Sequence, residues 1–202
     1  MSAVTMWRTT PPAPDPRSTW VTKSGRALIL PIYRGTFERR DGLPSTWPDS
    51  SRRYSEYVVN WIQDLERTLE YLQTRPDIAM DKLAYFGASW GGRLGAIIPA
   101  IEPRFKAVIL VAAGLASGRA QPEVDQISYV TRVRQPVLMI NGRFDAIEPV
   151  ETAQRPIFEL LGTPKDRKKW VVFEDDHSLP NHGNELAREA LAWLDRYVGP
   201  VQ

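Results

Sequence analysis

The sequence predicts an α/β fold of three layers, in which a doubly wound, mostly parallel sheet is flanked by helices. Two observations favour this class. Short apolar runs alternate along the chain with stretches whose apolar residues recur at helical spacing, as expected for parallel strands joined by right-handed crossovers. In addition, a serine, an aspartate and a histidine each follow closely after one of these runs, and open α/β sheets build their sites at the carboxyl ends of strands.

The length and composition suit one domain. The chain has 202 residues, of which 43% are hydrophobic, so one buried core over residues 1–202 is expected. Residues 1–20 form an N-terminal arm with a short β-prone run, 4–7, and a proline-rich loop, 11–16. The other predicted strands are 27–32, 83–86, 105–111, 136–140 and 170–173. The predicted helices are 18–23, 54–72, 93–101, 150–161 and 185–198.

The clearest helical periodicity lies in 54–72. Its apolar residues recur every three or four positions with polar residues between them, at Tyr57, Val58, Trp61, Ile62, Leu65, Leu69 and Leu72. The helix is expected to end before Arg75, because the residue that precedes a proline disfavours the helical region. The runs 105–111 and 136–140 are almost continuously apolar, which is typical of strands buried on both faces.

Between strand 83–86 and helix 93–101 stands Gly87-Ala88-Ser89-Trp90-Gly91-Gly92. A sharp turn that lifts a side chain above the end of a strand needs glycines where a Cβ would clash. We therefore expect Gly87 and Gly91 to leave room for a strained backbone at Ser89, the turn known as a nucleophile elbow. Strand-to-helix turns in general also favour glycine and serine, so the context of the motif has to decide.

The context supplies an acid and a base in the required order. Asp145 follows strand 136–140, and His177 follows strand 170–173. Ser89, Asp145 and His177 are thus each expected at the carboxyl end of a separate strand, and the ends of parallel strands meet at one edge of a sheet.

At these motifs the chain resembles the α/β-hydrolase family, and within it the dienelactone hydrolase and prolyl oligopeptidase-like branches. The resemblance rests on residues 87–92, on Asn141-Gly142-Arg143-Phe144-Asp145 with Glu148-Pro149 behind it, and on His177-Ser178-Leu179-Pro180. It spans residues 20–198. It departs from the family where Asp176 stands in place of the glycine that often precedes the histidine.

The resemblance implies roles for these residues. Ser89 would be the nucleophile, His177 the base that accepts its proton, and Asp145 the acid that holds the imidazole tautomer. The amide of Trp90 would be one oxyanion donor. The usual His-Gly sequence for the second donor is absent, which leaves three candidates for that role: Thr9, Thr10 and the hydroxyl of Tyr33.

The family's topology also implies a strand between 27–32 and 83–86, and the run 4–7 is the best candidate for it. The first two family strands would then be missing, which gives a compact fold with an open edge. Such an edge favours a homo-oligomer, most simply a dimer through residues 1–20. The competing interpretation is that the sequence is a fragment of a longer hydrolase.

Several residues compete for the assigned roles. Glu148, Asp175 and Asp176 are rival acids, but Glu148 is expected at a helix start, where the helix dipole favours a carboxylate anyway. Asp175 and Asp176 are too close to His177 in sequence to reach it easily. His182 is expected to be exposed on the surface. Three aromatic residues, Trp90, Tyr33 and Trp170, are candidate pocket walls, although core packing is the commoner role for such side chains.

Composition excludes several other classes. The 26 basic and 24 acidic residues show no block that suggests nucleic-acid or membrane binding. The chain has no cysteine and only two histidines, so we expect no metal and no cofactor. No apolar stretch is long enough for a signal core or a membrane span, and a soluble, cytoplasmic protein is expected.

The sequence therefore predicts a serine carboxylesterase for small or short-chain esters. The segment 115–133, where relatives insert caps, is at most a short flap, and a shallow pocket suits small substrates. Two alternatives stay open, an oligopeptidase-like serine peptidase and a non-catalytic hydrolase-fold module.

Overall fold

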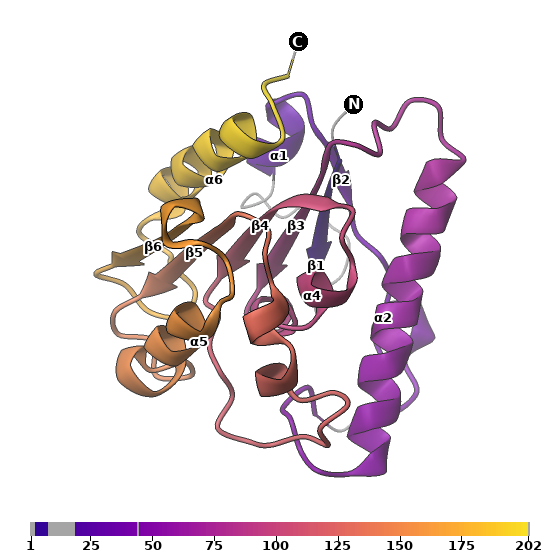
Figure 1. Cartoon of the computed structure of the whole chain (residues 1–202), viewed down its shortest axis with the longest axis vertical. Coiled ribbons are helices and arrows are strands. Elements are labelled where there is room, and N and C mark those ends of the chain that lie inside the picture. Colours follow the sequence, from indigo (N-terminus) through magenta and orange to yellow (C-terminus); the bar gives the residue numbers. More distant parts are fainter. Residues whose placement is uncertain (1–2, 8–18, 44, 202) are drawn as a thin grey trace.

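In the computed structural model the chain folds around a six-stranded sheet whose neighbouring strands pair in parallel (Figure 1). The structure describes residues 3–7, 19–43 and 45–201. The strand order is β2-β1-β3-β4-β5-β6. The strands are β1 (Ala3–Trp7), β2 (Ala27–Ile29), β3 (Leu83–Ala88), β4 (Phe105–Val111), β5 (Val137–Gly142) and β6 (Lys168–Phe173).

Helices cover both faces of the sheet, which confirms the predicted three-layer class. Helices α1 (Thr19–Lys23) and α6 (Gly183–Tyr197) pack on one face. The other face carries α2 (Arg52–Gln73), α3 (Trp90–Leu94), α4 (Ile98–Ile101) and α5 (Arg155–Leu160). Single helical turns lie in the connections, at η1 (Phe37–Arg39), η2 (Gln126–Ser128), η3 (Val130–Arg132), η4 (Val150–Gln154) and η5 (Lys165–Arg167).

Strand β3 shows how the two cores are built. Leu83 and Tyr85 belong to the core beneath α2, whereas Ala84 and Phe86 belong to the core beneath α6. Successive side chains of a strand point to opposite faces, so a continuous apolar run serves both layers. This explains why β3 reads as an uninterrupted apolar segment.

The N-terminal run 4–7 is a strand, and it occupies the place predicted for it. Strand β1 pairs with β2 on one side and with β3 on the other. Residues 3–7 of the arm are therefore an interior strand of the sheet. The predicted loop 11–16 and two candidate oxyanion donors, Thr9 and Thr10, lie outside the described residues.

Helix α2 brings its apolar stripe against the helix that follows Ser89. It starts at a capped end, where the Ser51 hydroxyl accepts a hydrogen bond from the Tyr54 amide at 3.1 Å. Trp61 is fully buried, and its ring meets that of Trp90 edge-on with centroids 4.4 Å apart. Burial of one such side chain stabilises the fold by about 1.5–3 kcal/mol.

Prolines shorten or divide three predicted elements. The predicted helix 93–101 is two helices, α3 and α4, because a proline ring at Pro99 would clash with the carbonyl four residues earlier. The predicted helix 150–161 is a π-helical turn, η4, followed by α5, with Pro156 in the first turn of α5. The predicted strand 27–32 stops at residue 29, two positions before Pro31, which has no N–H to donate to the sheet.

The segment 115–133 is short, as predicted, and its only regular structure is the pair of turns η2 and η3. Within the described part of the chain, no helix combines the length and the apolar character needed to cross a membrane.

Candidate active site

Ser89 stands at a strained turn between β3 and α3. Its backbone φ is 52° and its ψ is −111°, a conformation that costs a non-glycine residue about 1–3 kcal/mol. The turn is held from both sides, because the Ser89 amide donates to the Val111 carbonyl and its own carbonyl accepts from the Arg93 amide, each at 2.9 Å. A Cβ at Gly87 would overlap the carbonyl of Gly91. This is the backbone that the elbow motif predicted.

Asp145 lies in the turn after β5 with its carboxylate fully engaged. One oxygen, Oδ1, accepts hydrogen bonds from the amides of Ile147 and Glu148, both at 2.9 Å. The other oxygen, Oδ2, lies 2.7 Å from Nδ1 of His177. Only 3% of the residue is exposed, so its orientation is set by these partners rather than by solvent.

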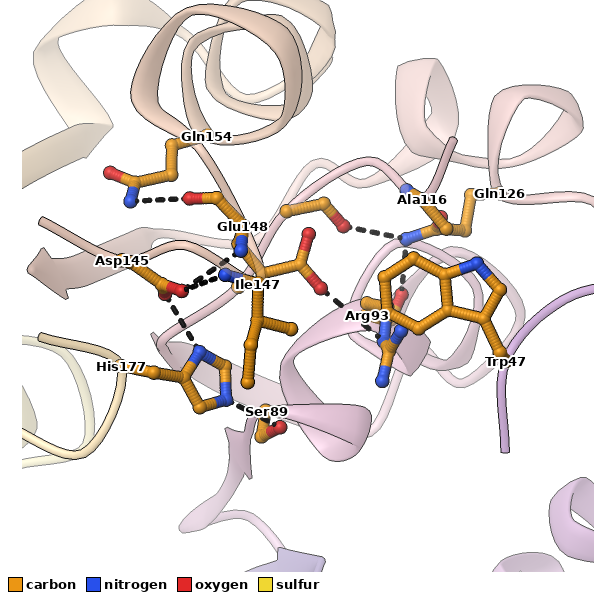
Figure 2. Close-up of polar contacts among 12 residues, drawn as sticks. Trp47, Ser89, Arg93, Ala116, Gln126, Asp145, Ile147, Glu148, Gln154 and His177 are labelled. Atoms are coloured by element: carbon orange, nitrogen blue, oxygen red, sulfur yellow. Dashed lines mark hydrogen bonds and ion pairs between the residues drawn. The ribbon is translucent and has the colours of Figure 1, made fainter. Parts of the chain in front are cut away.

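His177 joins the acid to the serine. Its Nε2 lies 2.8 Å from Oγ of Ser89, and Figure 2 shows the imidazole between the carboxylate and the hydroxyl. When Nδ1 carries the proton that Asp145 accepts, Nε2 keeps its lone pair toward the hydroxyl. The structure therefore brings together three residues from the ends of three strands, β3, β5 and β6.

The rival residues in the same loop form a separate contact. Nδ1 of His182 lies 2.8 Å from Oδ2 of Asp175, and its ring stacks on Phe173 with centroids 4.6 Å apart. The side chain of His182 is 27% exposed, so the expectation of a surface histidine was wrong: this ring is partly buried and has a partner. Asp176 accepts a hydrogen bond from the Ser178 amide.

Glu148 lies close to the predicted helix start, but in an environment that the sequence did not indicate. It lies in the loop before η4, with a side chain that is 2% exposed, and its Oε1 is 3.5 Å from Nε of Arg93. Burial raises the pKa of Glu148 to about 7, although the positive charge of Arg93 acts against this rise. Burial likewise lowers the pKa of Arg93. The expected helix dipole therefore does not govern this carboxyl, because its desolvation outweighs the nearby charge.

Arg93 itself was missed by the sequence reasoning. The only available signal was a single cation in an otherwise small and apolar stretch, residues 90–101. Its guanidinium is covered by the ring of Trp47, with the central carbon 4.2 Å from the ring centroid.

The candidate oxyanion and pocket residues are mostly in the core. The amide of Trp90 opens α3 directly after Ser89, but its side chain is only 3% exposed. Tyr33 is 1% exposed, and burial raises the pKa of its hydroxyl well above the ordinary value. Both rings are thus packing residues rather than open pocket walls. Trp170, on β6, is half-buried against Phe158.

The fold and the family match together identify the chain as an α/β-hydrolase of the carboxylic ester hydrolase class. Residues 45–200 match the family model described as PET hydrolase-like, and the chain belongs to that family.

Solved structures with the same fold include a cold-adapted esterase from an Arctic intertidal metagenomic library, with a TM-score of 0.76 and 20% identity over 97% of this chain and 82% of that one. TT1662 from Thermus thermophilus gives a TM-score of 0.76 at 18% identity, covering 99% of this chain and 90% of that one. A Klebsiella pneumoniae protein assigned as a dienelactone hydrolase gives a TM-score of 0.72 at 20% identity, covering 96% and 86%.

Proposed function

We propose that the protein is a serine carboxylesterase that hydrolyses small or short-chain esters through an acyl-enzyme. The observation that carries the proposal is the line of contacts from Asp145 through His177 to Ser89, at 2.7 and 2.8 Å. A serine hydroxyl becomes an effective nucleophile when a neighbouring base accepts its proton. Both distances are within the range that general base catalysis requires.

In this mechanism Oγ of Ser89 attacks the ester carbonyl carbon while Nε2 of His177 takes the hydroxyl proton. Asp145 stabilises the resulting imidazolium through Nδ1. The tetrahedral intermediate then expels the alcohol, whose oxygen receives the proton from His177. A water molecule attacks the acyl-enzyme with His177 again as the base, and the acid leaves as Ser89 regains its proton.

The oxyanion of the intermediate needs at least two donors. The amide of Trp90 is the first, since it directly follows Ser89 at the start of α3. For the second, Thr9 and Thr10 are the candidates, whereas the Tyr33 hydroxyl is not proposed, because that residue is only 1% exposed in the core. Removal of one donor typically costs about 2.7–4 kcal/mol of transition-state stabilisation, so a weak second donor would give a slow enzyme.

Features around the site support a small, apolar substrate. The turn that carries Asp145 also presents two large apolar side chains to solvent, Phe144 at 63% and Ile147 at 50% exposure. Within the described residues, the segment 115–133 adds only two short helical turns. The family name adds an aromatic polyester to the candidates, so a soluble terephthalate diester belongs in the substrate panel beside short-chain aryl esters.

The direct test is covalent labelling. A fluorophosphonate probe should label Ser89 of the folded protein, as read by peptide mass spectrometry. Ser89→Ala should lose both the label and ester hydrolysis, because the change removes one oxygen from the site. Ser178→Ala is the matched control, since that exposed serine lies next to His177. Undiminished turnover by folded Ser89→Ala would falsify the assignment.

The same experiment separates the alternatives. A non-catalytic module would take no label at all. An oligopeptidase-like peptidase would take the label but cleave short peptides faster than the matching esters.

We further propose a homo-oligomer. Strand β2 is an edge of the sheet, and an open edge invites pairing. Because β1 is an interior strand, removal of the arm would break the sheet, so the test is light scattering of the intact chain; a monomer at micromolar concentration contradicts the proposal.

A further inference from the structure

We propose that Glu148, joined to Arg93, is a positioning residue that keeps Asp145 and His177 aligned with Ser89, and that it does so only as an ionised carboxylate. This inference rests on the proposed function, because it concerns the same reaction. It adds a fourth and a fifth residue, neither of which touches the reacting atoms.

The backbone of Glu148 is held at both of its polar groups. Its amide donates to Oδ1 of Asp145 at 2.9 Å, and its carbonyl accepts from Nε2 of Gln154 at 2.7 Å. The same Gln154 amide group also donates to the carbonyl of Gly142, at the end of β5. Glu148 therefore joins the turn of the catalytic acid to the strand that precedes it.

The side chain of Glu148 reaches the element that carries the nucleophile. Its Oε1 lies 3.5 Å from Nε of Arg93, which is four residues after Ser89 and donates its amide to the Ser89 carbonyl. Figure 2 shows this pair as a bridge between the turn of Asp145 and the helix after Ser89. The carboxyl group uses space left by Gly114, where a Cβ would overlap Oε2.

Arg93 is held as firmly as its partner. Nε2 of Gln126 donates to the carbonyls of Arg93 and Gly114, at 2.9 and 3.1 Å. Trp47 covers the guanidinium, and the Arg93 side chain is 8% exposed. A buried ion pair with clamped backbones has few ways to rearrange, so a change of charge on either member is transmitted to its neighbours.

Protonation of Glu148 would remove the nearest counter-charge of a buried guanidinium and leave it only the more distant Asp145. The charged and titratable groups that act on Glu148 are Arg93 of α3, Asp145 of its own turn and His177 of the loop after β6. Asp145 and Tyr54 of α2 also act on Arg93. Burial raises the pKa of Glu148 to about 7, close to the range in which an imidazole titrates. The negative charge of Glu148 also favours the imidazolium that forms on His177.

The expected consequence is a steep acid limb in the pH dependence of turnover. As pH falls, a reaction of this kind loses its general base, and protonation of Glu148 additionally releases the bridge. The logarithm of kcat/KM for a short aryl ester should then fall with a slope approaching two. A single ionisation gives a slope of one.

The variants to compare are Glu148→Gln and Glu151→Gln. Glu148→Gln should lower kcat by about tenfold or more above pH 8, since small misplacements of catalytic groups cost up to about a hundredfold in rate. Its KM should change less than twofold. The acid limb of its pH profile should become a one-proton curve. Glu151→Gln is the matched control, because Glu151 is an exposed carboxylate three residues away that pairs with Arg155. It should behave as the wild type.

Glu148→Asp keeps the negative charge and should keep the two-proton limb with a reduced kcat, and it replaces Glu148→Gln if that variant fails to fold. Arg93→Met combined with Glu148→Gln should lower kcat no more than the worse single variant does.

A one-proton limb in the wild type, or a Glu148→Gln enzyme with wild-type kcat and pH profile, overturns the inference. If Ser89 is labelled while Glu148→Gln is unchanged, only this inference fails. If Ser89 is not labelled, the proposed function fails.

Discussion

The loop after β6 carries two histidines, and each of them contacts an aspartate through Nδ1. The distances are 2.7 Å for His177 to Asp145 and 2.8 Å for His182 to Asp175, so the two pairs have nearly the same geometry. They differ in the other side of the ring. His177 directs Nε2 to a strained serine, whereas His182 stacks on Phe173. The group on the far side of the imidazole, a serine hydroxyl or an aromatic ring, therefore decides whether a histidine–aspartate pair can act as a base.

The pairs also differ in how far they reach along the chain. Asp175 lies seven residues before His182, and it also accepts a hydrogen bond from the Asn181 amide, so this pair closes a local loop. Asp145 lies 32 residues before His177 and at the end of a neighbouring strand. The contact between Asp175 and His182 therefore stabilises the loop. The contact between Asp145 and His177 forms only when the sheet places β5 beside β6.

The largest expected effect separates the two histidines. His177→Ala should reduce turnover by about 10⁴-fold or more, because the members of such a triad act as a unit. His182→Ala should keep turnover within about threefold but lower stability by about 1–2 kcal/mol through loss of a hydrogen bond and a stacked ring. Steady-state kinetics and thermal melts check both. A greater loss of activity in His182→Ala would show that the base has been misassigned.

The two aspartates should likewise differ, one substitution affecting mainly activity and the other mainly stability. Asp145→Asn should reduce kcat by about 10⁴-fold, because an amide that donates to Nδ1 favours the wrong tautomer. Asp175→Asn should mainly lower the melting temperature, by roughly 2–4 °C for each kcal/mol lost. If both variants lost activity equally, the local pair would have to share in the chemistry.

A third prediction concerns stability and pH. The pKa of Glu148 is raised in the folded state from the ordinary 4.5 to about 7. The folded protein therefore binds this proton more tightly, and the associated stability is present below about pH 4.5 and lost as pH rises through 7. Urea unfolding should show that the free energy of unfolding of the wild type falls between pH 5 and pH 8. In Glu148→Gln this fall should be about 1–2 kcal/mol smaller. An equal pH difference in both proteins would contradict the raised pKa.

The smallest effect tests the apolar rim beside Asp145. Phe144→Ala and Ile147→Ala should each raise KM for butyl or aryl esters by about two- to fivefold, in line with the loss of part of an apolar contact, and leave kcat almost unchanged. Val59→Ala, an exposed apolar residue on α2, is the control. If the KM values of Phe144→Ala and Ile147→Ala equalled that of the control, the substrate would have to bind elsewhere.

Much of the fold could be predicted because its signals are local. Strand 105–111 agrees with the structure at both ends, and the helix predicted over 54–72 is α2, with its cap at Ser51. Ser89, Asp145 and His177 could be named because each lies within four residues of the end of a strand, and parallel strands end at one edge. The divided helices show where periodicity misled, since Pro99 and Pro156 remove backbone donors that an apolar pattern does not reveal.

The sequence by itself thus determined the layers, the strands and the order of the serine, acid and base, because each of these depends on neighbours along the chain. Only the tertiary structure decided the partners. Glu148 lies against Arg93, 55 positions earlier in the numbering, and His182 lies against Asp175 rather than in solvent. Such contacts, and the pKa values that follow from them, depend on which side chains the packed sheet excludes from water, and burial of that kind is set by the whole fold.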